Sequence, residues 1–558
     1  MKESLCLLKS NCKNCYKCIR NCPVKAISFK DNQANIIQHE CILCGECFVV
    51  CPQNAKSIRK DLPSAKKLLR SGVPVYASIA PSFIANYENV TIDLMRSALK
   101  QLGFTDAEET AVGATVVKKH YDSLIASGKM PVIISSCCHT VNLLIQKYYP
   151  SALSCLAKVP SPMLVHGTML KQAKADAKVV FIGPCISKKD EMEQYGIIDC
   201  VLTFEDLTKW LEEEKITLKT STTEESPGGK ARLFPLAGGI LRSMQADNPA
   251  YAYLTIDGID NCIAALEDIV KGNLQNCFIE MSACKGSCIG GPVMEQNGIA
   301  PVRGYINISR HTGQEDFHVE MPDAAALIKN IPFQVVHKPR VGSHAIEEAL
   351  QKMGKKRIED ELNCGSCGYN TCREKASAIL EGKADVSMCL PYLMERAQSF
   401  SDTIIRNTPN GIIVLNHALE VQQINKAACT IMNIDCEADV LGRQVVCILD
   451  PEPFIDVVAN HRNIYDRRLY LAEYNRYVKL TVLYDLSFHI VISIMRDITD
   501  RETERVSREA QHCKTIEITD KVIEKQMRTV QEIASLLGET TAETKIALTK
   551  LKETLQNE

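Results

Sequence analysis

The stretch that decides the fold is Phe278-Ile-Glu-Met-Ser-Ala-Cys284-Lys-Gly-Ser-Cys288-Ile-Gly-Gly-Pro-Val-Met294. Small residues around its two cysteines let the backbone pass close to a bulky group, and thiolates in such a setting suit an inorganic cluster. Two earlier segments, Ile134-Ser-Ser-Cys-Cys-His and Ile182-Gly-Pro-Cys-Ile-Ser-Lys-Lys, place a cysteine where an apolar strand would stop. Open α/β sheets build their sites at such strand ends, so the three segments predict one shared site.

In order and spacing, these segments resemble the signature segments of the FeFe (iron-only) hydrogenases, over roughly residues 73 to 332. The resemblance implies a 4Fe-4S cluster held by Cys138, Cys185, Cys284 and Cys288. It implies that Cys288 also bridges to a di-iron subsite carrying CO and cyanide, and that Lys188 hydrogen-bonds a cyanide. Cys137 takes the place of the proton-relay thiol. The alternative, a set of ordinary buried cysteines, does not account for three segments in this order.

An internal repeat occupies the beginning of the chain. Cys12-x2-Cys15-x2-Cys18-x3-Cys22-Pro23 recurs as Cys41-x2-Cys44-x2-Cys47-x3-Cys51-Pro52. This is the spacing of two-cluster 4Fe-4S ferredoxins, in which the fourth cysteine of each run binds the other cluster. We therefore expect one cluster on Cys12, Cys15, Cys18 and Cys51, and the other on Cys41, Cys44, Cys47 and Cys22. Paired C-x2-C also makes zinc sites, but the third cysteine and the Cys-Pro of both halves favour clusters.

A third cysteine group follows as Cys364-x2-Cys367-x4-Cys372-x16-Cys389. It resembles the small 4Fe-4S modules of corrinoid iron–sulfur proteins. Glycines between the thiols let backbone amides approach the sulfurs, where hydrogen bonds tune a cluster's potential. Structural zinc is the alternative for four cysteines in a compact helical segment.

The last part of the chain changes character. Residues 396–502 hold expected strands at 411–416 and 421–425 and later at 477–482 and 489–496, and they resemble a PAS domain. Residues 503–558 repeat apolar positions in 4-3 steps, which is a coiled-coil seam and predicts a homodimer. A helical hairpin, or a single helix lying on its own protein, remains open. We expect Cys429, Cys436 and Cys447 to be core residues rather than ligands.

The expected fold is multidomain, α/β and α+β. Strands at about 73–80, 131–136 and 178–183 alternate with helices, which predicts mostly parallel strands. Residues 59–70 are expected to form a linker helix, 221–230 a surface loop, and Cys155, Cys200, Cys262 and Cys277 part of the core. The expected parts are a ferredoxin-like domain with two 4Fe-4S clusters (1–58), a hydrogenase H-cluster domain (59–339), a 4Fe-4S module (340–395), a PAS domain (396–502) and a signalling helix (503–558).

Composition limits the partners and the cellular compartment that we expect for this chain. The 558 residues carry a net charge of −2, which predicts no nucleic-acid partner, and 26 cysteines. No apolar run approaches the roughly 20 residues that span a bilayer, and the first residues lack a signal-peptide core. Cysteine-rich disulfide scaffolds are short and secreted. We therefore expect a cytoplasmic protein of an anaerobe, with cysteines that bind metal.

Several positions depart from the catalytic members of the family. The resemblance places Thr110 and Gly113 where two proton-carrying glutamates belong, and Gly183 and Ser282 where two methionines shield the di-iron site. Fast turnover needs positioned proton carriers. These departures predict slow turnover.

The resemblance implies an enzyme that interconverts H2 with protons and electrons. We expect a sensory iron-only hydrogenase that passes hydrogen or redox state through its clusters, PAS domain and coiled coil to an unidentified signalling protein, such as a kinase or phosphatase. A catalytic hydrogenase with ferredoxin as redox partner is one alternative. A non-enzymatic iron–sulfur relay without the di-iron subsite is the other.

Overall fold

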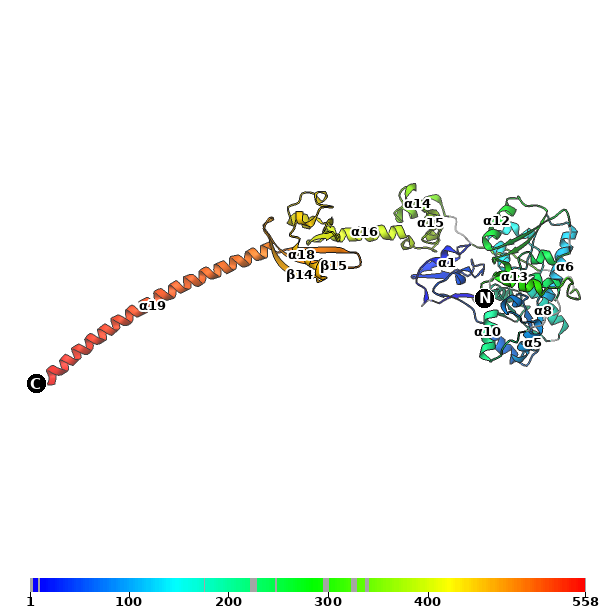
Figure 1. The fold of residues 1–558 in the computed structure, drawn as a ribbon, viewed down its shortest axis with the longest axis horizontal. Coiled ribbons are helices and arrows are strands. Elements are labelled where there is room, and N and C mark those ends of the chain that lie inside the picture. The colour runs from blue at the N-terminus through cyan, green and yellow to red at the C-terminus, as the bar shows by residue number, and fades with distance from the viewer. Residues whose placement is uncertain are drawn as a thin grey trace. The chain divides into compact units, whose positions relative to one another are not determined.

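The computed structural model describes residues 4–8, 11–174, 176–220, 228–245, 248–294, 301–322, 329–336 and 341–556. The chain divides into two compact units, Met1–Leu393 and Met394–Glu558. Figure 1 shows the ribbon of the chain and labels some of its helices and strands. Within the described part of the chain, no helix combines the length and the apolar character needed to span a bilayer.

The ferredoxin-like part of the first unit repeats a helix and a strand pair. β1 (Leu5–Leu7) pairs antiparallel with β4 (Lys56–Ile58), and β2 (Ile27–Lys30) with β3 (Gln33–Ile36). Two one-turn helices stand beside the cysteine runs: α1 (Lys17–Arg20) and α2 (Glu46–Val49). The expected linker helix follows as α3 (Leu62–Leu69), which confirms that prediction.

A four-stranded parallel sheet comes next, in the order β6-β5-β8-β9. Its strands are β5 (Val75–Ile79), β6 (Asp106–Glu109), β8 (Lys178–Gly183) and β9 (Cys200–Thr203). The helices between them are α4 (Phe83–Asn86), α5 (Ile92–Gln101), α6 (Ala111–Ser127), α8 (Pro162–Ala173), α9 (Lys188–Tyr195) and α10 (Phe204–Glu213). Thr91 and Thr203 cap α5 and α10 through their hydroxyl oxygens.

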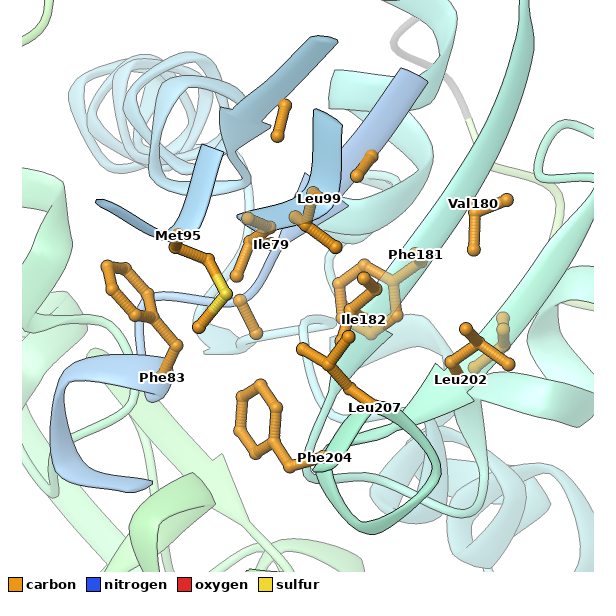
Figure 2. Packing of buried hydrophobic residues seen from close by; sticks show 14 of the residues in the cluster. Ile79, Phe83, Met95, Leu99, Val180, Phe181, Ile182, Leu202, Phe204 and Leu207 are labelled. Atoms are coloured by element: carbon orange, nitrogen blue, oxygen red, sulfur yellow. The ribbon is translucent and has the colours of Figure 1, made fainter. Parts of the chain in front are cut away.

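Both faces of the central strands are buried, as in most parallel sheets. Figure 2 shows Met95 and Leu99 of α5 and Phe204 and Leu207 of α10 gathered around Ile79 and Ile182. The predicted strands β5 and β8 are confirmed. The sequence analysis missed β6, whose short run is polar, and β9, whose short run lies directly before a helix.

A second parallel sheet has the order β10-β11-β7. It consists of β7 (Val132–Ile134), β10 (Ala252–Asp257) and β11 (Cys277–Ser282), with α7 (His139–Tyr148) after β7 and α12 (Ile259–Val270) between β10 and β11. Shorter pieces complete the region: η2 (Pro150–Cys155), η3 (Lys230–Leu233), α11 (Gly239–Ser243), η4 (Ser287–Gly290) and α13 (Pro301–Arg310). Cys200, Cys262 and Cys277 are buried, as predicted, and Cys155 is half-buried. Residues 221–227 of the expected loop lie outside the described residues.

The third cysteine group lies in a small helical module. Its elements are α14 (Ser343–Lys352), η6 (Ile358–Asp360), α15 (Cys372–Leu380) and η7 (Val386–Met388). Cys389 directly precedes α16 (Leu390–Asn407), the helix that leads into the second unit.

The second unit contains a five-stranded antiparallel sheet in the order β13-β12-β16-β15-β14. Its strands are β12 (Gly411–Leu415), β13 (Val421–Ile424), β14 (Ile464–Leu471), β15 (Arg476–Asp485) and β16 (Ile490–Asp497). The intervening helices are α17 (Lys426–Ile431), η8 (Glu437–Asp439), η9 (Val445–Cys447) and α18 (Glu452–Asn460). The four strands predicted from the sequence are present. β14 was missed because most of its side chains are exposed and mostly polar.

Two details correct the expectations for this unit. Cys429 is buried as predicted, but Cys436 and Cys447 are exposed, because both belong to short surface turns. The last 58 residues of the described chain form one continuous helix, α19 (Thr499–Gln556), and not a hairpin. Large apolar residues along this helix, among them Ile523, Met527 and Val530, are more than half exposed.

Candidate metal centres

Three strand ends of the first unit meet at one cavity of about 130 Å³. Cys137 and Cys138 follow β7, Cys185 follows β8, and Cys284 and Cys288 follow β11. All five cysteines line the cavity together with Lys188. The structure thus brings together every residue that the sequence predicted for this site.

The thiols face the cavity from inside the domain. Cys288 is exposed, Cys138, Cys185 and Cys284 are half-buried, and all four line this space. Burial raises the pKa of the Cys288 thiol to about 12, and neighbouring Cys138 and Cys185 raise it further. Thiolates crowded in a buried place need bound metal, which deprotonates a coordinating thiol.

The donor set of this site suits a cluster. Cys138, Cys185, Cys284 and Cys288 bring four soft thiol donors to one cavity. Four such donors suit a cubane, with each sulfur on a different iron.

Lys188 places a positive charge at the cavity. Its ammonium donates to the Cys137 carbonyl at 3.2 Å and to Glu191 Oε2 at 2.5 Å. Lys329 also donates to Glu191, at 2.7 Å. Burial alone would raise the pKa of Glu191, but the two ammonium groups hold it below its usual value. An ionised Glu191 keeps Lys188 charged, so the site offers a cation to an anionic ligand.

Cys137 has a hydrogen-bonding partner of its own. The hydroxyl of Tyr121 lies 3.2 Å from its sulfur and 3.1 Å from the Ser136 hydroxyl. Burial raises the pKa of the Cys137 thiol to about 12. The neutral thiol thus lies at the cavity and within hydrogen-bonding reach of the Tyr121 hydroxyl.

Thr110 and Gly113 stand where the resemblance implies two glutamates, and the structure shows what surrounds each of them. Thr110 lines the cavity, and its hydroxyl lies 2.8 Å from that of Ser78. Gly113 is where α6 crosses α8, and a Cβ there would lie 2.6 Å from the Pro162 carbonyl oxygen. A glutamate at position 113 does not fit this crossing.

Gly183 and Ser282 stand where the resemblance implies two methionines. Ser282 lines the cavity, as the sequence placed it. At Gly183 a Cβ would lie 2.8 Å from the ring of Phe181, and that ring forms part of the cavity wall. An aromatic side chain from the same strand therefore occupies space that a longer side chain at 183 would need.

Glu280 is the functional candidate that the sequence analysis missed. It lies on β11, lines the cavity, and accepts a hydrogen bond from the Leu241 amide at 3.0 Å. Burial raises its pKa to about 7, although several backbone amides oppose the shift. The signal was a lone carboxyl inside the apolar run Phe278–Ser282.

The thiols of the ferredoxin-like cysteines influence one another in two sets. Burial raises the pKa of Cys18 to about 11, opposed by Lys56 and increased by the three thiols Cys12, Cys15 and Cys51. Burial likewise raises the pKa of Cys47, increased by Cys44, Cys41 and Cys22. Because electrostatic influence falls with distance, these two sets are spatial neighbours.

Backbone amides approach three of these sulfurs. The donors are Ala26 to Cys22 at 3.3 Å, Leu43 to Cys41 at 3.4 Å and Ala55 to Cys51 at 3.3 Å. Such hydrogen bonds set the reduction potential of a cluster. In the third group, Cys364, Cys367, Cys372 and Cys389 line one pocket with Tyr369 and Lys375.

Three segments match known protein families. Residues 73–292 match the iron only hydrogenase large subunit, C-terminal domain; residues 11–55 match a 4Fe-4S dicluster domain; and residues 360–391 match a family of Fe-S cluster domains. Residues 73–292 therefore form an iron-only hydrogenase domain, and a ferredoxin-type two-cluster domain precedes it. The matches confirm the expected 4Fe-4S cofactors, and the hydrogenase domain is of the kind that carries a di-iron subsite.

Full-length relatives are distant. Iron hydrogenase 1 of Clostridium pasteurianum is 26% identical over 41% of this chain and 50% of its own length. The periplasmic [Fe] hydrogenase large subunit of Nitratidesulfovibrio vulgaris is 27% identical over 51% of this chain and 86% of its own. The chain thus spans about half the length of the first of these relatives.

Among solved structures, the [FeFe]-hydrogenase HydA1 of Chlamydomonas reinhardtii aligns with a TM-score of 0.40 and 15% identity, covering 50% of this chain and all of that one. A PAS domain of an HTR-like protein from Haloarcula marismortui aligns with a TM-score of 0.16 and 21% identity, covering 19% of this chain and 95% of that one.

Proposed function

We propose that this chain is a slow iron-only hydrogenase that interconverts H2 with two protons and two electrons and reports its redox state to its C-terminal part. The observation that carries the proposal is the cavity where cysteines from three strand ends converge with Lys188. It lies in the domain that matches iron-only hydrogenases.

The proposed ligands follow the sequence prediction. Cys138, Cys185, Cys284 and Cys288 would hold the cubane at the cavity, and Cys288 would bridge to the di-iron subsite. The two crossed sets in residues 1–58 and the group at 340–395 would each hold 4Fe-4S clusters. The hydrogenase domain would span 59–339.

When bound, the di-iron subsite supplies the metal chemistry that splits or forms H2. The protein contributes charge, proton transfer and exclusion of water. The Lys188 ammonium would hydrogen-bond an anionic ligand, while Cys137 and Glu280 would move protons to and from the cavity. Phe181, Phe234 and Ile240 line the wall and keep water out.

The sensory assignment rests on the second unit. We infer a PAS domain at 396–502, supported by its five-stranded antiparallel sheet, and a dimerising coiled coil at 503–558, supported by the exposed apolar positions of α19. A helix pair of this kind can shift between two packing arrangements, and such a shift can be sensed by a signalling partner such as a kinase or phosphatase. The cysteine content favours a reducing cytoplasm, although one relative is periplasmic.

An anaerobic experiment tests the proposal. Protein matured with the di-iron subsite should show infrared bands of CO and cyanide and should catalyse exchange between H2 and D2O. Cys288→Ala should lose both while the ferredoxin-type clusters remain visible by electron paramagnetic resonance (EPR). CO and cyanide bands without exchange would favour a site that only binds H2. Clusters without any such bands would favour the non-enzymatic relay, and fast turnover with ferredoxin would favour the catalytic alternative.

A further inference from the structure

The Cys41–Cys47 loop of the ferredoxin-like part rests directly on the hydrogenase domain. Gly45, next to Cys44, has a φ of +80°, and a Cβ there would lie 2.6 Å from Pro292 Cγ and 2.9 Å from Ile186 Cδ1. Ile186 follows the ligand Cys185. Lys147 donates to the Cys41 carbonyl at 2.7 Å. Only glycine allows so close an approach in this backbone conformation.

The Cys364–Gly368 loop makes a similarly close approach to the ferredoxin-like part. Gly368, next to Cys367, has a φ of +92°, and a Cβ there would lie 3.0 Å from both the Arg20 nitrogen and Ile19 Cγ2. Arg20 in turn donates from its guanidinium to the Ser366 carbonyl at 3.1 Å. The loop of the third cysteine group therefore packs on the turn between Cys18 and Cys22.

Lys25 ties the Cys18–Cys22 turn to the Cys364–Gly368 loop. Its ammonium donates to the Gly368 carbonyl at 2.9 Å and to the Arg20 carbonyl at 3.1 Å. The next residue, Ala26, donates its amide to the sulfur of Cys22. One side chain thus spans from the turn that carries Cys22 to the residue after Cys367.

A second tie holds the module on the same part. Lys383 forms an ion pair with Glu40 at 2.8 Å, and its carbonyl accepts from the Phe29 amide at 2.7 Å. Glu40 precedes Cys41. The module is therefore fixed at two points, one on the turn between Cys18 and Cys22 and one beside Cys41.

We propose that Gly45, Gly368 and Lys25 are positioning residues that make the Cys22/Cys41/Cys44/Cys47 cluster a branch point between the hydrogenase site and the cluster of the third group. Electron transfer weakens steeply with distance, so ligand loops in direct contact define its route. Because Cys389 directly precedes α16, the third cluster is the internal electron acceptor at the start of the helix leading to the second unit.

The electrons and protons of this route balance, and the route rests on the proposed function. One H2 yields two protons and two electrons. One electron is taken up by the third cluster, and the other is taken up by a ferredoxin-type cluster. Cys15 is exposed, so the Cys12/Cys15/Cys18/Cys51 cluster is the exit to an external redox partner. The chain then has one external and one internal electron exit.

The first test measures magnetic coupling, which needs no di-iron subsite. Full-length protein carrying its 4Fe-4S clusters is reduced with dithionite, and its EPR signals are compared among wild type, Gly368→Ala and Gly382→Ala. Gly382 is a matched control, since it also has a positive φ, +70°, but no atom within 4 Å of a Cβ. Wild type and Gly382→Ala should show signals broadened by coupling to the third cluster, and a Cys372→Ser/Cys389→Ser variant should lack that broadening.

Gly368→Ala should lose the broadening with unchanged iron content. Lys25→Met should weaken the broadening and lower the reduction potential of the third cluster. Because this variant leaves the backbone of the Cys364–Gly368 loop unchanged, it tests the proposal even if Gly368→Ala loses iron. Equal coupling in wild type and in both variants at full iron content overturns the proposal.

The second test uses hydrogen with matured protein. Rapid-freeze EPR under H2 should show the third cluster reduced together with the ferredoxin-type clusters in wild type, and delayed in Gly368→Ala. Coupling under dithionite without any reduction by H2 refutes the hydrogenase function and leaves the branch point standing. Reduction of the ferredoxin-type clusters by H2, with an uncoupled third cluster that stays oxidised, refutes the branch point alone.

Discussion

At the scale of single residues, Glu280 is the carboxyl that we expect to carry protons to the cavity. Its pKa of about 7 lets it accept and donate protons at neutral pH. Glu280→Gln keeps an acceptor for the Leu241 amide but removes the titrating proton. We expect H2/D2O exchange to fall by about 10²–10⁴-fold.

The pH dependence provides the control for this prediction. In wild type, exchange should change with pH around 7 as Glu280 passes from its neutral form below that pH to its charged form above it. Glu280→Gln should lack this inflection, while Glu267→Gln, at an exposed position on α12, should keep both the rate and the inflection. An unaltered rate in Glu280→Gln would show that protons travel by another route.

At the scale of elements, the crossing of α6 and α8 depends on Gly113. A methyl group there would press on the Pro162 carbonyl oxygen and the backbone of His166. Overpacking of this kind costs about 1–3 kcal/mol, so Gly113→Ala should lower the thermal unfolding midpoint by several degrees. Gly342→Ala, with open space around its Cβ, is the control and should change the midpoint little. Equal midpoints for the two variants would mean that the helices shift apart freely.

The helix α19 offers a second prediction at this scale. Val530 lies on the 4-3 seam and is 59% exposed. A charge there would be buried in a paired helix, so Val530→Glu should weaken the dimer at least about tenfold, whereas the neighbouring off-seam change Gln531→Glu should not. Analytical ultracentrifugation of both variants measures the effect. A wild-type monomer at all concentrations would contradict the coiled-coil assignment.

At the scale of the whole molecule, iron content counts the clusters. Four cubanes and a di-iron subsite predict roughly eighteen iron atoms per chain in matured protein. The Cys372→Ser/Cys389→Ser variant should hold roughly four fewer, with no zinc in either protein. Bound zinc in wild type, together with the lower iron count, would show that the third group is a zinc site.

The last prediction concerns signal transfer along the chain. If redox state biases the helix pair, amide hydrogen exchange in residues 503–558 should differ between protein kept under H2 and protein kept in oxidant. Cys288→Ala, which cannot react with H2, should show the same exchange in both conditions. Identical protection in matured wild type would favour the catalytic alternative with ferredoxin as partner.

The sequence by itself determined which cysteines belong together. Ligands within one loop, such as Cys41, Cys44 and Cys47, have a spacing set by the local chain path, so pattern alone identified them. The signature segments similarly indicated the site of Cys284 and Cys288. Long apolar runs such as β8 and the periodic helix α19 were also readable, because their signals repeat within the element.

Only the tertiary structure decided what those residues meet. The pKa of Glu280, the ring of Phe181 in the wall and the crossing at Gly113 each depend on packing between segments far apart in sequence. The same holds for Gly45 and Gly368, whose lack of a side chain matters only because another domain's loop lies against them. Spacing is a property of the local chain, whereas dielectric environment and close approach arise only when distant segments pack.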